Sequence, residues 1–435
     1  MIIIKLKELT SGDYQRIAAR SSGDNPEILP KVKMIMETVK RQGDKFLIDE
    51  YQRRFPDADF KSLLVSKEEI RQAYKQVSRQ FFKGIKQMIK NITLVHQAQL
   101  PGKTEREVNP EKGIAVWRVW RPIEKVGIYI PGGKAIYPSS VLMTAIPAAI
   151  AGCLEIVMCS PARGNGQIPA ATLVAADMAG LTKIFKTGGA EAIAAMTFGT
   201  ETIPAVYKIF GAGNSLVTAA KVLAMEKIAI DMPAGPSEVF IIADKSANPK
   251  YIAADLLADG EHGEDSACVL ITTSQDVAQE TIAEIKKQLP KLSTRKLAEA
   301  SIGKYGLFAV ADSLEEAIGF TNKYAPEHLE IMVKNPEKVV AKITNAGSVF
   351  LGDYTSKASC DYATGANHVL PTGGMAKIYP PLGVDAFGKW MQVQKCKREG
   401  LKKIRETIRT LSEVEKLPAH GNSAEIRFLE DKNYD

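Results

Sequence analysis

Histidine and cysteine, with five residues each, are the scarcest side chains of this sequence that could carry acid–base or metal chemistry. Only five histidines occur in 435 residues, and four have polar neighbours that could support a site: His262, His328, His368 and His420. A neutral imidazole near its ordinary pKa can accept a proton at physiological pH. The fifth, His96, lies in an amphipathic segment, where a core or surface role is expected.

Asp259 and His262 are three residues apart at the end of an expected helix, 249–260. Residues at i and i+3 share a helix face, so this carboxylate and imidazole could form half of a zinc site. Taken alone, the pair is more typical of a helix end with a charge-paired histidine. Further ligands are needed before the sequence indicates a metal.

Glu327 and His328 are adjacent, between an expected helix and an expected strand. They could supply two acid–base groups to one cleft, or they could be two solvated groups at a helix end. Asp361 and His368 lie in an irregular Gly- and Thr-rich segment with too many specific polar residues for a simple linker. His420 stands in the C-terminal tail, where a lone histidine is normally exposed.

Four connections rich in Gly, Pro and Ser follow expected strands: 131–134, 188–189, 211–215 and 233–237. Glycine lets backbone N–H groups approach a phosphate, and a helix N-terminus favours its charge. Ligands of open α/β sheets bind at the carboxyl ends of strands. None of these loops matches the G-x-G-x-x-G fingerprint, and each could be an ordinary turn. Four on successive connections favour a nucleotide site.

The elements that must position these residues alternate between short apolar strands and helices. Such alternation predicts parallel sheets built from βαβ units, in two series. Residues 10–100 and the chain from 384 onward are expected to be mostly helical. The expected strands are 113–119, 124–130, 155–160, 183–187 and 207–210, then 238–243, 268–273, 307–311, 329–333 and 348–351.

Composition excludes several classes of protein. Apolar residues make up 45% and charged residues 25%, which is ordinary globular composition, and the net charge of +7 suits an anionic cofactor without implying nucleic acid. Five cysteines without a C-x-x-C pair do not form a disulfide framework, so a reducing, cytoplasmic location is expected. The apolar stretch 141–158 is broken by Pro147, Gly152 and Glu155, which favours a buried helix and strand over a membrane span.

Eight segments together form a specific pattern. They are 126–143 (VGIYIPGGKAIYPSSVLM), 188–200 (GGAEAIAAMTFGT), 209–217 (IFGAGNSLV), 231–239 (DMPAGPSEV), 255–266, 325–329 (APEHL), 361–372 (DYATGANHVLPT) and 415–420. Their order and spacing are those of the histidinol dehydrogenase family, which the chain resembles over almost its whole length. We therefore expect an α/β fold of two Rossmann-like parallel-sheet domains without the fingerprint. The expected parts are a segment 1–24, a first domain of 25–130 and 238–380, an NAD-binding domain 131–237 and a helical tail 381–435.

The resemblance implies an enzyme that oxidises L-histidinol to the aldehyde and then, as its hydrate, to L-histidine, with two NAD molecules and one zinc ion per site. His328 would be the base of the alcohol step, and Glu327 would activate water in the aldehyde step. The implied zinc ligands are Asp259, His262, Asp361 and His420. Implied substrate contacts include these ligands with Ser237, His328, His368 and Glu415, and NAD contacts are Tyr129, Glu191 and Asn214. It also implies a homodimer in which the tail completes the partner's site.

Four residues depart from the family's pattern: Asp259 and Glu191 replace glutamines, Lys357 replaces a glutamate and Cys360 replaces a glycine. Asp259 keeps an oxygen ligand but adds negative charge, which should tighten metal binding and reduce the metal's Lewis acidity. Glu191 is an acceptor where the amide could donate. At Cys360 a small packed thiol is expected, rather than a redox-sensitive one.

Three functions remain open at this point. Glu415 could pair with a substrate ammonium group, which favours histidinol. A related dehydrogenase could instead oxidise another small alcohol, such as a sulfonated propanediol, with Lys357 aiding its recognition. A non-catalytic metal- or nucleotide-binding relative is the third, and the intact Glu327 and His328 argue against it. Whether zinc or manganese would fill the site also remains open.

Overall fold

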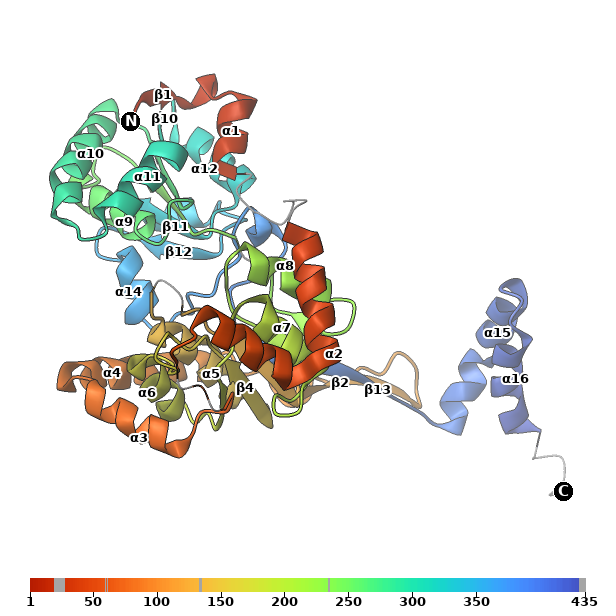
Figure 1. Cartoon of the computed structure of the whole chain (residues 1–435). Helices are drawn as coiled ribbons and strands as arrows, with labels where there is room; N and C mark the ends of the chain where they lie inside the picture. The colour runs from red at the N-terminus through yellow and green to blue at the C-terminus, as the bar shows by residue number, and fades with distance from the viewer. Residues whose placement is uncertain (19–27, 59, 61, 133–134, 234, 430–435) are drawn as a thin grey trace. The chain divides into compact units, whose positions relative to one another are not determined.

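The computed structural model describes residues 1–18, 28–58, 60, 62–132, 135–233 and 235–429. Gly133 and Lys134 of the first Gly-rich loop and Ala234 of the last lie outside the described residues. The chain forms two compact units, residues 1–100 with 123–387 and residues 101–122 with 388–435 (Figure 1). The larger unit contains two parallel sheets with helices, as the βα alternation predicts.

The first sheet has six parallel strands. Their order is β1 (Ile3–Lys5), β10 (Leu307–Val310), β9 (Ala267–Thr272), β8 (Glu238–Ala243), β11 (His328–Met332) and β12 (Ser348–Leu351). Every residue of β8, β9 and β11 is buried, which explains the apolar runs of β8 and β9, whereas β11 also buries His328 and Glu330. Successive side chains point to opposite faces. Phe240 and Ile242 therefore pack in one core, and Val239 and Ile241 pack in the other.

The helices around this sheet close its two cores. Side chains of α9 (Pro249–Gly260), α10 (Gln275–Gln288) and α11 (Arg295–Tyr305) pack on one face. Side chains of α1 (Ser11–Ala18), α12 (Leu314–Tyr324) and α13 (Pro336–Val340) pack on the other. Helix α11 and strand β1 were not predicted from the sequence. A three-residue strand at a chain end carries too few residues for a periodic signal.

The second sheet has five parallel strands in the order β5 (Lys183–Phe185), β4 (Glu155–Cys159), β3 (Lys125–Tyr129), β6 (Lys208–Phe210) and β7 (Ala229–Ile230). Helices α2 (Ile28–Arg54), α7 (Gly189–Phe198) and α8 (Ser215–Ala224) share one core with it. The other core contains α3 (Lys67–Gln76), α4 (Arg79–Gln97), α5 (Pro138–Ala151) and α6 (Ala170–Met178). The chain thus runs outward from β3 through β4 to β5, then crosses back to β6.

The packing of the N-terminal helices differs from the expected division. Residues 25–130 were grouped with 238–380, but α2, α3 and α4 pack on the five-stranded sheet. The segment from residue 1 contributes β1 and α1 to the six-stranded sheet instead of standing apart. Amphipathic periodicity shows that a helix has an apolar face but not which sheet covers it.

The second unit is an antiparallel ribbon followed by two helices. Strand β2 (Ile114–Pro122) pairs with β13 (Gly388–Cys396), and α15 (Arg398–Val414) and α16 (Pro418–Glu425) follow. The expectation of helix from residue 384 onward is wrong for β13, although it is confirmed for most of 398–425. The ribbon places Trp390 opposite Trp120, and these rings meet edge to face, a cross-strand contact that local pattern does not reveal.

The apolar stretch 141–158 is resolved as predicted into a helix and a strand. Helix α5 ends at Gly152, which adopts φ 91°, and β4 begins at Glu155. In the described part of the chain, no helix is long and apolar enough to cross a membrane.

Candidate active site

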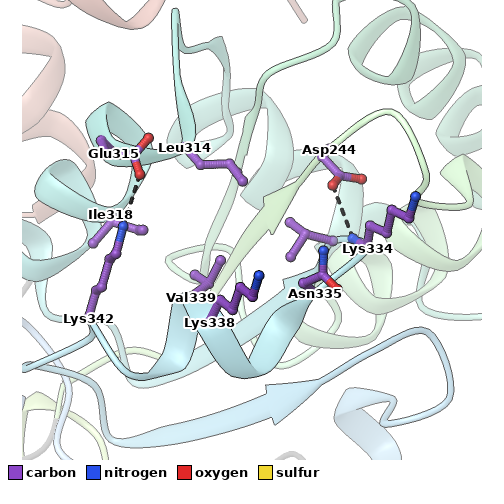
Figure 2. A pocket seen from close by; sticks show the side chains of 10 residues that line it. Asp244, Leu314, Glu315, Ile318, Lys334, Asn335, Lys338, Val339 and Lys342 are labelled. Carbon is purple, nitrogen blue, oxygen red and sulfur yellow. Dashed lines mark hydrogen bonds and ion pairs between the residues drawn. The ribbon is translucent and has the colours of Figure 1, made fainter.

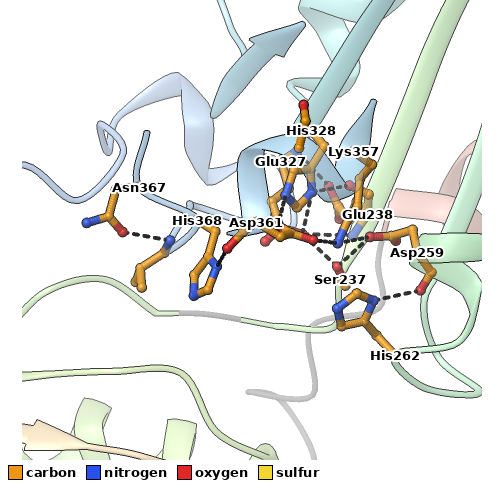
Figure 3. Close-up of polar contacts among 12 residues, drawn as sticks. Ser237, Glu238, Asp259, His262, Glu327, His328, Lys357, Asp361, Asn367 and His368 are labelled. Carbon is orange, nitrogen blue, oxygen red and sulfur yellow. Dashed lines mark hydrogen bonds and ion pairs between the residues drawn. The ribbon is translucent and has the colours of Figure 1, made fainter. Parts of the chain in front are cut away.

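The predicted catalytic residues meet at the amino ends of two neighbouring strands. Ser237 precedes β8, Glu327 precedes β11, and His328 is the first residue of β11. The parallel register places His328 opposite Val239, so these ends coincide. Carboxyl strand ends were the expected place for a ligand. In the six-stranded sheet, His328 and the carboxylates near it lie instead at the amino ends of the strands (Figure 3).

The carboxyl ends of β8 and β11 border a shallow pocket with a different character (Figure 2). Asp244 accepts a hydrogen bond from the backbone N–H of Lys334 at 3.0 Å, and Lys342 pairs with Glu315 at 2.9 Å. No histidine or cysteine lines this pocket in the described residues. It therefore offers no acid–base pair comparable to that at the amino ends.

Helix α14 (Lys357–Tyr362) brings the two remaining charged groups of the site. Lys357 and Asp361 are four residues apart and share a buried face of this helix. The backbone N–H of Lys357 also donates to Asp255 of α9 at 3.3 Å, which ties the start of α14 to that helix. The sequence did not predict a helix here, because six residues are too few to show a helical period.

The Lys357 ammonium lies between two carboxylates. Its Nζ is 2.9 Å from Oδ2 of Asp361 and 3.2 Å from Oδ1 of Asp259 (Figure 3). The side chains of Lys357 and Asp259 are 2% and 0% exposed, so this is a buried ionic cluster. Ser237 Oγ donates to the same Oδ1 of Asp259 at 2.8 Å. Such burial is tolerated only when charges are paired and hydrogen-bonded.

The charges of this cluster stabilise one another. Burial by itself favours the neutral acids, but the Lys357 ammonium holds the pKa of Asp259 and that of Asp361 below their ordinary values. Burial would likewise lower the pKa of Lys357, yet Asp259 and Asp361 raise it above its ordinary value. The three groups are therefore ionised at neutral pH, with a net charge of one negative unit.

The hydrogen bonds of His328 define its tautomer. Its Nδ1 lies 2.9 Å from the backbone carbonyl oxygen of Glu238, which can only accept, so Nδ1 carries the proton. Its buried Nε2 has no hydrogen-bond partner among the described residues and lies 4.0 Å from Asp361 Oδ1. Burial lowers the pKa of His328, but the Glu327 and Asp259 carboxylates together raise it above its ordinary value. Nε2 is thus a buried proton acceptor.

Glu327 lies beside this imidazole and is held by two donors. Its Oε2 accepts a hydrogen bond from the backbone N–H of Glu238 at 2.8 Å, shares the single O–H proton of Ser237, 3.2 Å away, with Asp259, and is 3.5 Å from His328 Nδ1. Glu238 was not predicted as a site residue, although it follows Ser237 in a matched segment. Its own carboxylate accepts from the backbone N–H groups of Glu327 and Gly373, so it fixes the loops around the site.

Two other histidines of the larger unit, His262 and His368, border this cluster. His368 is half-buried, with Nδ1 3.1 Å from the carbonyl oxygen of Asp361 and Nε2 3.2 Å from Ser140 Oγ. Burial lowers its pKa. The exposed His262 has Nδ1 3.2 Å from the carbonyl oxygen of Asp259. Glu415 and His420 are exposed residues of the second unit, which is described by itself.

The implied metal does not fit this arrangement. Among the residues that the structure describes, no group of three or more His, Cys, Asp or Glu side chains is placed to hold a metal ion. Asp259 and Asp361 do converge, but they converge on the Lys357 ammonium. The donor types suit zinc, whereas a cationic side chain already lies between two of the donors.

Cys360 behaves as the packed thiol that the sequence predicts. It is 2% exposed on the buried face of α14, and burial raises its pKa to about 11. The thiol is therefore protonated at neutral pH and a weak nucleophile. His96 is a core residue, fully buried, with Nδ1 2.8 Å from the carbonyl oxygen of Ile92 and Nε2 3.2 Å from the amide of Asn367.

The candidate NAD residues gather at the carboxyl ends of the five-stranded sheet. Tyr129 ends β3, and its hydroxyl accepts a hydrogen bond from the backbone N–H of Gly189 at 3.2 Å. Asn214 caps α8 by accepting from the N–H of Val217 at 3.1 Å. Glu191, in the first turn of α7, pairs with Arg54 at 2.5 Å. This arginine, which the sequence analysis missed, balances the charge that the glutamate introduces.

Comparisons with known proteins agree on one family. A family model described as histidinol dehydrogenase matches residues 18–428. A curated histidinol dehydrogenase of Methanothermobacter thermautotrophicus is 43% identical over 97% of this chain and 99% of its own, and one of Caldanaerobacter subterraneus is 44% identical over 98% of both. A crystal structure of histidinol dehydrogenase from Elizabethkingia anophelis superposes with a TM-score of 0.92 at 40% identity, covering 98% of this chain and 97% of that one.

Proposed function

This chain belongs to the histidinol dehydrogenase family, and from that premise we propose that the buried cluster around His328 is its active site. As a member of the family, the chain is an NAD-dependent oxidoreductase that oxidises histidinol in histidine biosynthesis. The observation that carries the site is the tautomer of His328, with Nδ1–H held by a carbonyl and Nε2 left as an acceptor. A general base needs this state, together with reach to the substrate proton.

In the alcohol step, His328 Nε2 takes the proton of the substrate hydroxyl. At the same time the hydrogen on the carbinol carbon leaves as hydride to the nicotinamide. The carbonyl oxygen of Glu238 holds the imidazole during this transfer, and the adjacent Glu327 carboxylate stabilises the imidazolium that forms. The products are the aldehyde, NADH and one proton.

In the aldehyde step, Glu327 accepts a proton from the water that adds to the carbonyl and returns it to the former carbonyl oxygen, giving the hydrate. The oxygen of Glu327 that accepts the hydrogen bonds from Ser237 and Glu238 is Oε2, so they do not occupy Oε1. His328 then takes a hydroxyl proton of the hydrate as a second hydride leaves for NAD. One histidinol and one water therefore yield histidine and two NADH.

The five-stranded sheet is the proposed NAD-binding, Rossmann-like domain. Its strand order reverses between β3 and β6, and crevices at such switch points bind dinucleotides. Tyr129, Glu191 and Asn214 surround this position at strand ends and helix starts. The pairing of Glu191 with Arg54 supports dinucleotide binding, because it removes the uncompensated negative charge that the sequence suggests.

The family's zinc positions fall on Asp259, His262, Asp361 and His420. When bound, zinc would act there as a Lewis acid and orient the alcohol. The described residues do not fit that role while Lys357 bridges two of the ligands, so the steps above use only the chain's own groups.

The second unit is proposed to pair two copies of the chain, with Glu415 and His420 of each tail completing the partner's site. Large apolar side chains of its helices are exposed: Leu411, Val414, Leu417, Ile426 and Leu429. Exposed apolar patches of this kind mark interaction surfaces. Glu415 would pair with the ammonium group of histidinol, and Ser237 and His368 would contact the substrate from the larger unit.

The geometry disfavours an anionic alcohol as the substrate. Recognition of a sulfonate by Lys357 would need a free ammonium, but this ammonium already pairs with Asp259 and Asp361. The cluster carries net negative charge and would repel a sulfonate. A cationic amino alcohol is the better match.

The test is NADH formation by the purified full chain with L-histidinol and NAD. About two NADH per histidinol are expected, and His328→Asn should lower kcat by about 10²- to 10⁴-fold because it removes the base. Lys342→Met, which removes one half of a surface ion pair, is the matched control and should leave the rate unchanged. Turnover of another alcohol with none of histidinol would refute the substrate, and an unaffected His328→Asn variant would refute the site.

A further inference from the structure

The reaction above gives no role to the Lys357 ammonium, although it lies inside the active-site cluster. An ammonium has three N–H donors, and the described residues accept two hydrogen bonds or ion-pair contacts from it, at Asp361 and Asp259. The lysine enters from α14, whose first N–H is fixed by Asp255. A cation is therefore built into the site by the polypeptide itself.

The position of this cation is the point where a metal would have to bind. A divalent ion held by Asp259 and Asp361 needs both carboxylates free, and it would lie beside a buried positive charge. Repulsion between charges a few ångströms apart in a buried site is strong, because water screens it weakly. The ammonium and a metal ion therefore compete for one place.

Asp259 and Lys357, which both depart from the family's pattern, depend on each other in this cluster. Asp259 is completely buried, and without Lys357 its carboxylate would keep, among the residues that the structure describes, only Ser237 as a close hydrogen-bond donor. Lys357 without Asp259 would be a buried ammonium with one carboxylate instead of two. A buried charge whose partner is removed is strongly destabilising, so each residue accounts for the presence of the other. Neither residue is explained as a ligand or substrate contact alone.

We propose that the Lys357 ammonium replaces the metal ion in this active site, so that the chain binds no zinc at Asp259 and Asp361 and works without it. The third N–H donates to the alcohol oxygen of the substrate. It stabilises the negative charge that develops there as His328 Nε2 removes the proton and hydride leaves for NAD. The ammonium keeps its own protons throughout, so the stoichiometry of the reaction does not change. The catalytic part of this inference rests on the proposed function, whereas the absence of zinc does not.

Metal content tests the proposal independently of turnover. The full chain is expressed with added zinc, dialysed against buffer without chelator, and analysed for zinc by mass spectrometry and by titration against a chromophoric chelator. The wild type and the Lys342→Met control should contain well below one zinc per chain. Asp259→Gln combined with Lys357→Glu, which restores the residues usual in the family, should bind zinc at least about tenfold more tightly than the wild type.

A second variant protects the test against misfolding of the double variant. Lys357→Met keeps the length of the side chain but frees both carboxylates, so it should gain zinc affinity and be stabilised by added zinc in thermal unfolding. Zinc near one equivalent in the wild type, with NADH formation lost on chelation and restored by zinc, would overturn the proposal. A wild type without zinc that oxidises histidinol in the presence of chelator would support it. A wild type without zinc that does not oxidise histidinol would overturn the proposed function and the catalytic role of the ammonium, leaving only the metal-free site.

Discussion

At the scale of single residues, the chemistry of this protein depends on which partner each buried polar atom has. His328 is proposed as the base because the carbonyl oxygen of Glu238 accepts from its Nδ1–H, which leaves Nε2 as the proton acceptor. Lys357 is neither a ligand nor a surface charge because two carboxylates surround it. Motifs correctly identified Glu327, His328 and Asp361 as neighbours, but a motif does not show which atom each side chain contacts. The contacts become visible only in the folded chain.

Removal of the Lys357 charge should destabilise the protein strongly. Lys357→Met leaves Asp259 and Asp361 buried without their main counter-charge, and loss of one partner of a buried pair costs about 3–5 kcal/mol. Urea unfolding at neutral pH in the presence of chelator measures this. Lys342→Met breaks an exposed pair and should change the free energy of unfolding by less than about 1 kcal/mol. Equal effects of the two substitutions would mean that the buried cluster is not strongly coupled.

A second pair of buried carboxyls predicts how stability depends on pH. Burial, reinforced by Asp255, raises the pKa of Glu330 well above 4.5, and burial also raises that of Asp255. At a pH above the ordinary carboxyl pKa, the folded chain therefore binds more protons than the unfolded chain. The contribution of Glu330 and Asp255 to the free energy of unfolding consequently falls as the pH rises from the ordinary carboxyl pKa through their pKa in the folded chain. Glu330→Gln should flatten that fall in thermal unfolding measured from pH 4.5 upward. An unchanged slope in the variant would exclude Glu330 as its source.

At the scale of elements, most strands and helices that carry the site were predictable. Strand β8 is fully buried and apolar after Glu238, and α9 places Asp259 in its last turn, as periodicity indicates. Three things were not predictable. Strand β13 depends on pairing with β2, which is far away in the sequence. Helix α14 is too short to show a period, and the sheet on which α2 packs is decided by tertiary contacts.

The packing of α2 against α7 predicts an effect on NAD. Arg54, in the last turn of α2, is the charge partner of Glu191 in the first turn of α7. Arg54→Met should raise the KM for NAD severalfold, within about tenfold because the arginine is half exposed, with little change in kcat. Arg53→Met is the matched control, since the ion pair of Arg53 is with Glu50, at 2.7 Å.

A second substitution isolates the charge of Glu191 as the cause of this effect. In the Arg54→Met background, Glu191→Gln removes the unpaired carboxylate and should restore most of the NAD affinity. If Glu191→Gln does not restore the NAD affinity, Arg54 affects NAD binding by some means other than neutralising Glu191. Initial rates at varied NAD and saturating histidinol measure both variants.

At the scale of the whole molecule, the proposed function calls for residues from both units. The larger unit holds the catalytic pair and the ionic cluster, whereas Glu415 belongs to the smaller one. Exposed apolar side chains on the last helices, Val414 at 74% and Leu411 at 55% among them, suit a contact between copies. We expect Leu411→Asp combined with Val414→Asp to weaken dimerisation, measured by sedimentation velocity, and to lower activity in proportion. A monomeric, fully active variant would contradict a shared site.

Mixed dimers can show directly whether each tail serves its own chain or the partner. His328→Asn inactivates the site on the larger unit, and Glu415→Gln weakens the substrate contact from the tail. If tails are exchanged, each mixed dimer has one site with both residues intact, while its other site has both changed. Half of randomly assembled dimers are mixed and one of two sites works in each, so co-refolding equal amounts should restore roughly a quarter of wild-type activity. A mixture of His328→Asn and Glu327→Gln, both on the larger unit, should restore none. Because a tail that folds back on its own chain gives two defective sites in every dimer, absence of recovery in the first mixture would refute exchange.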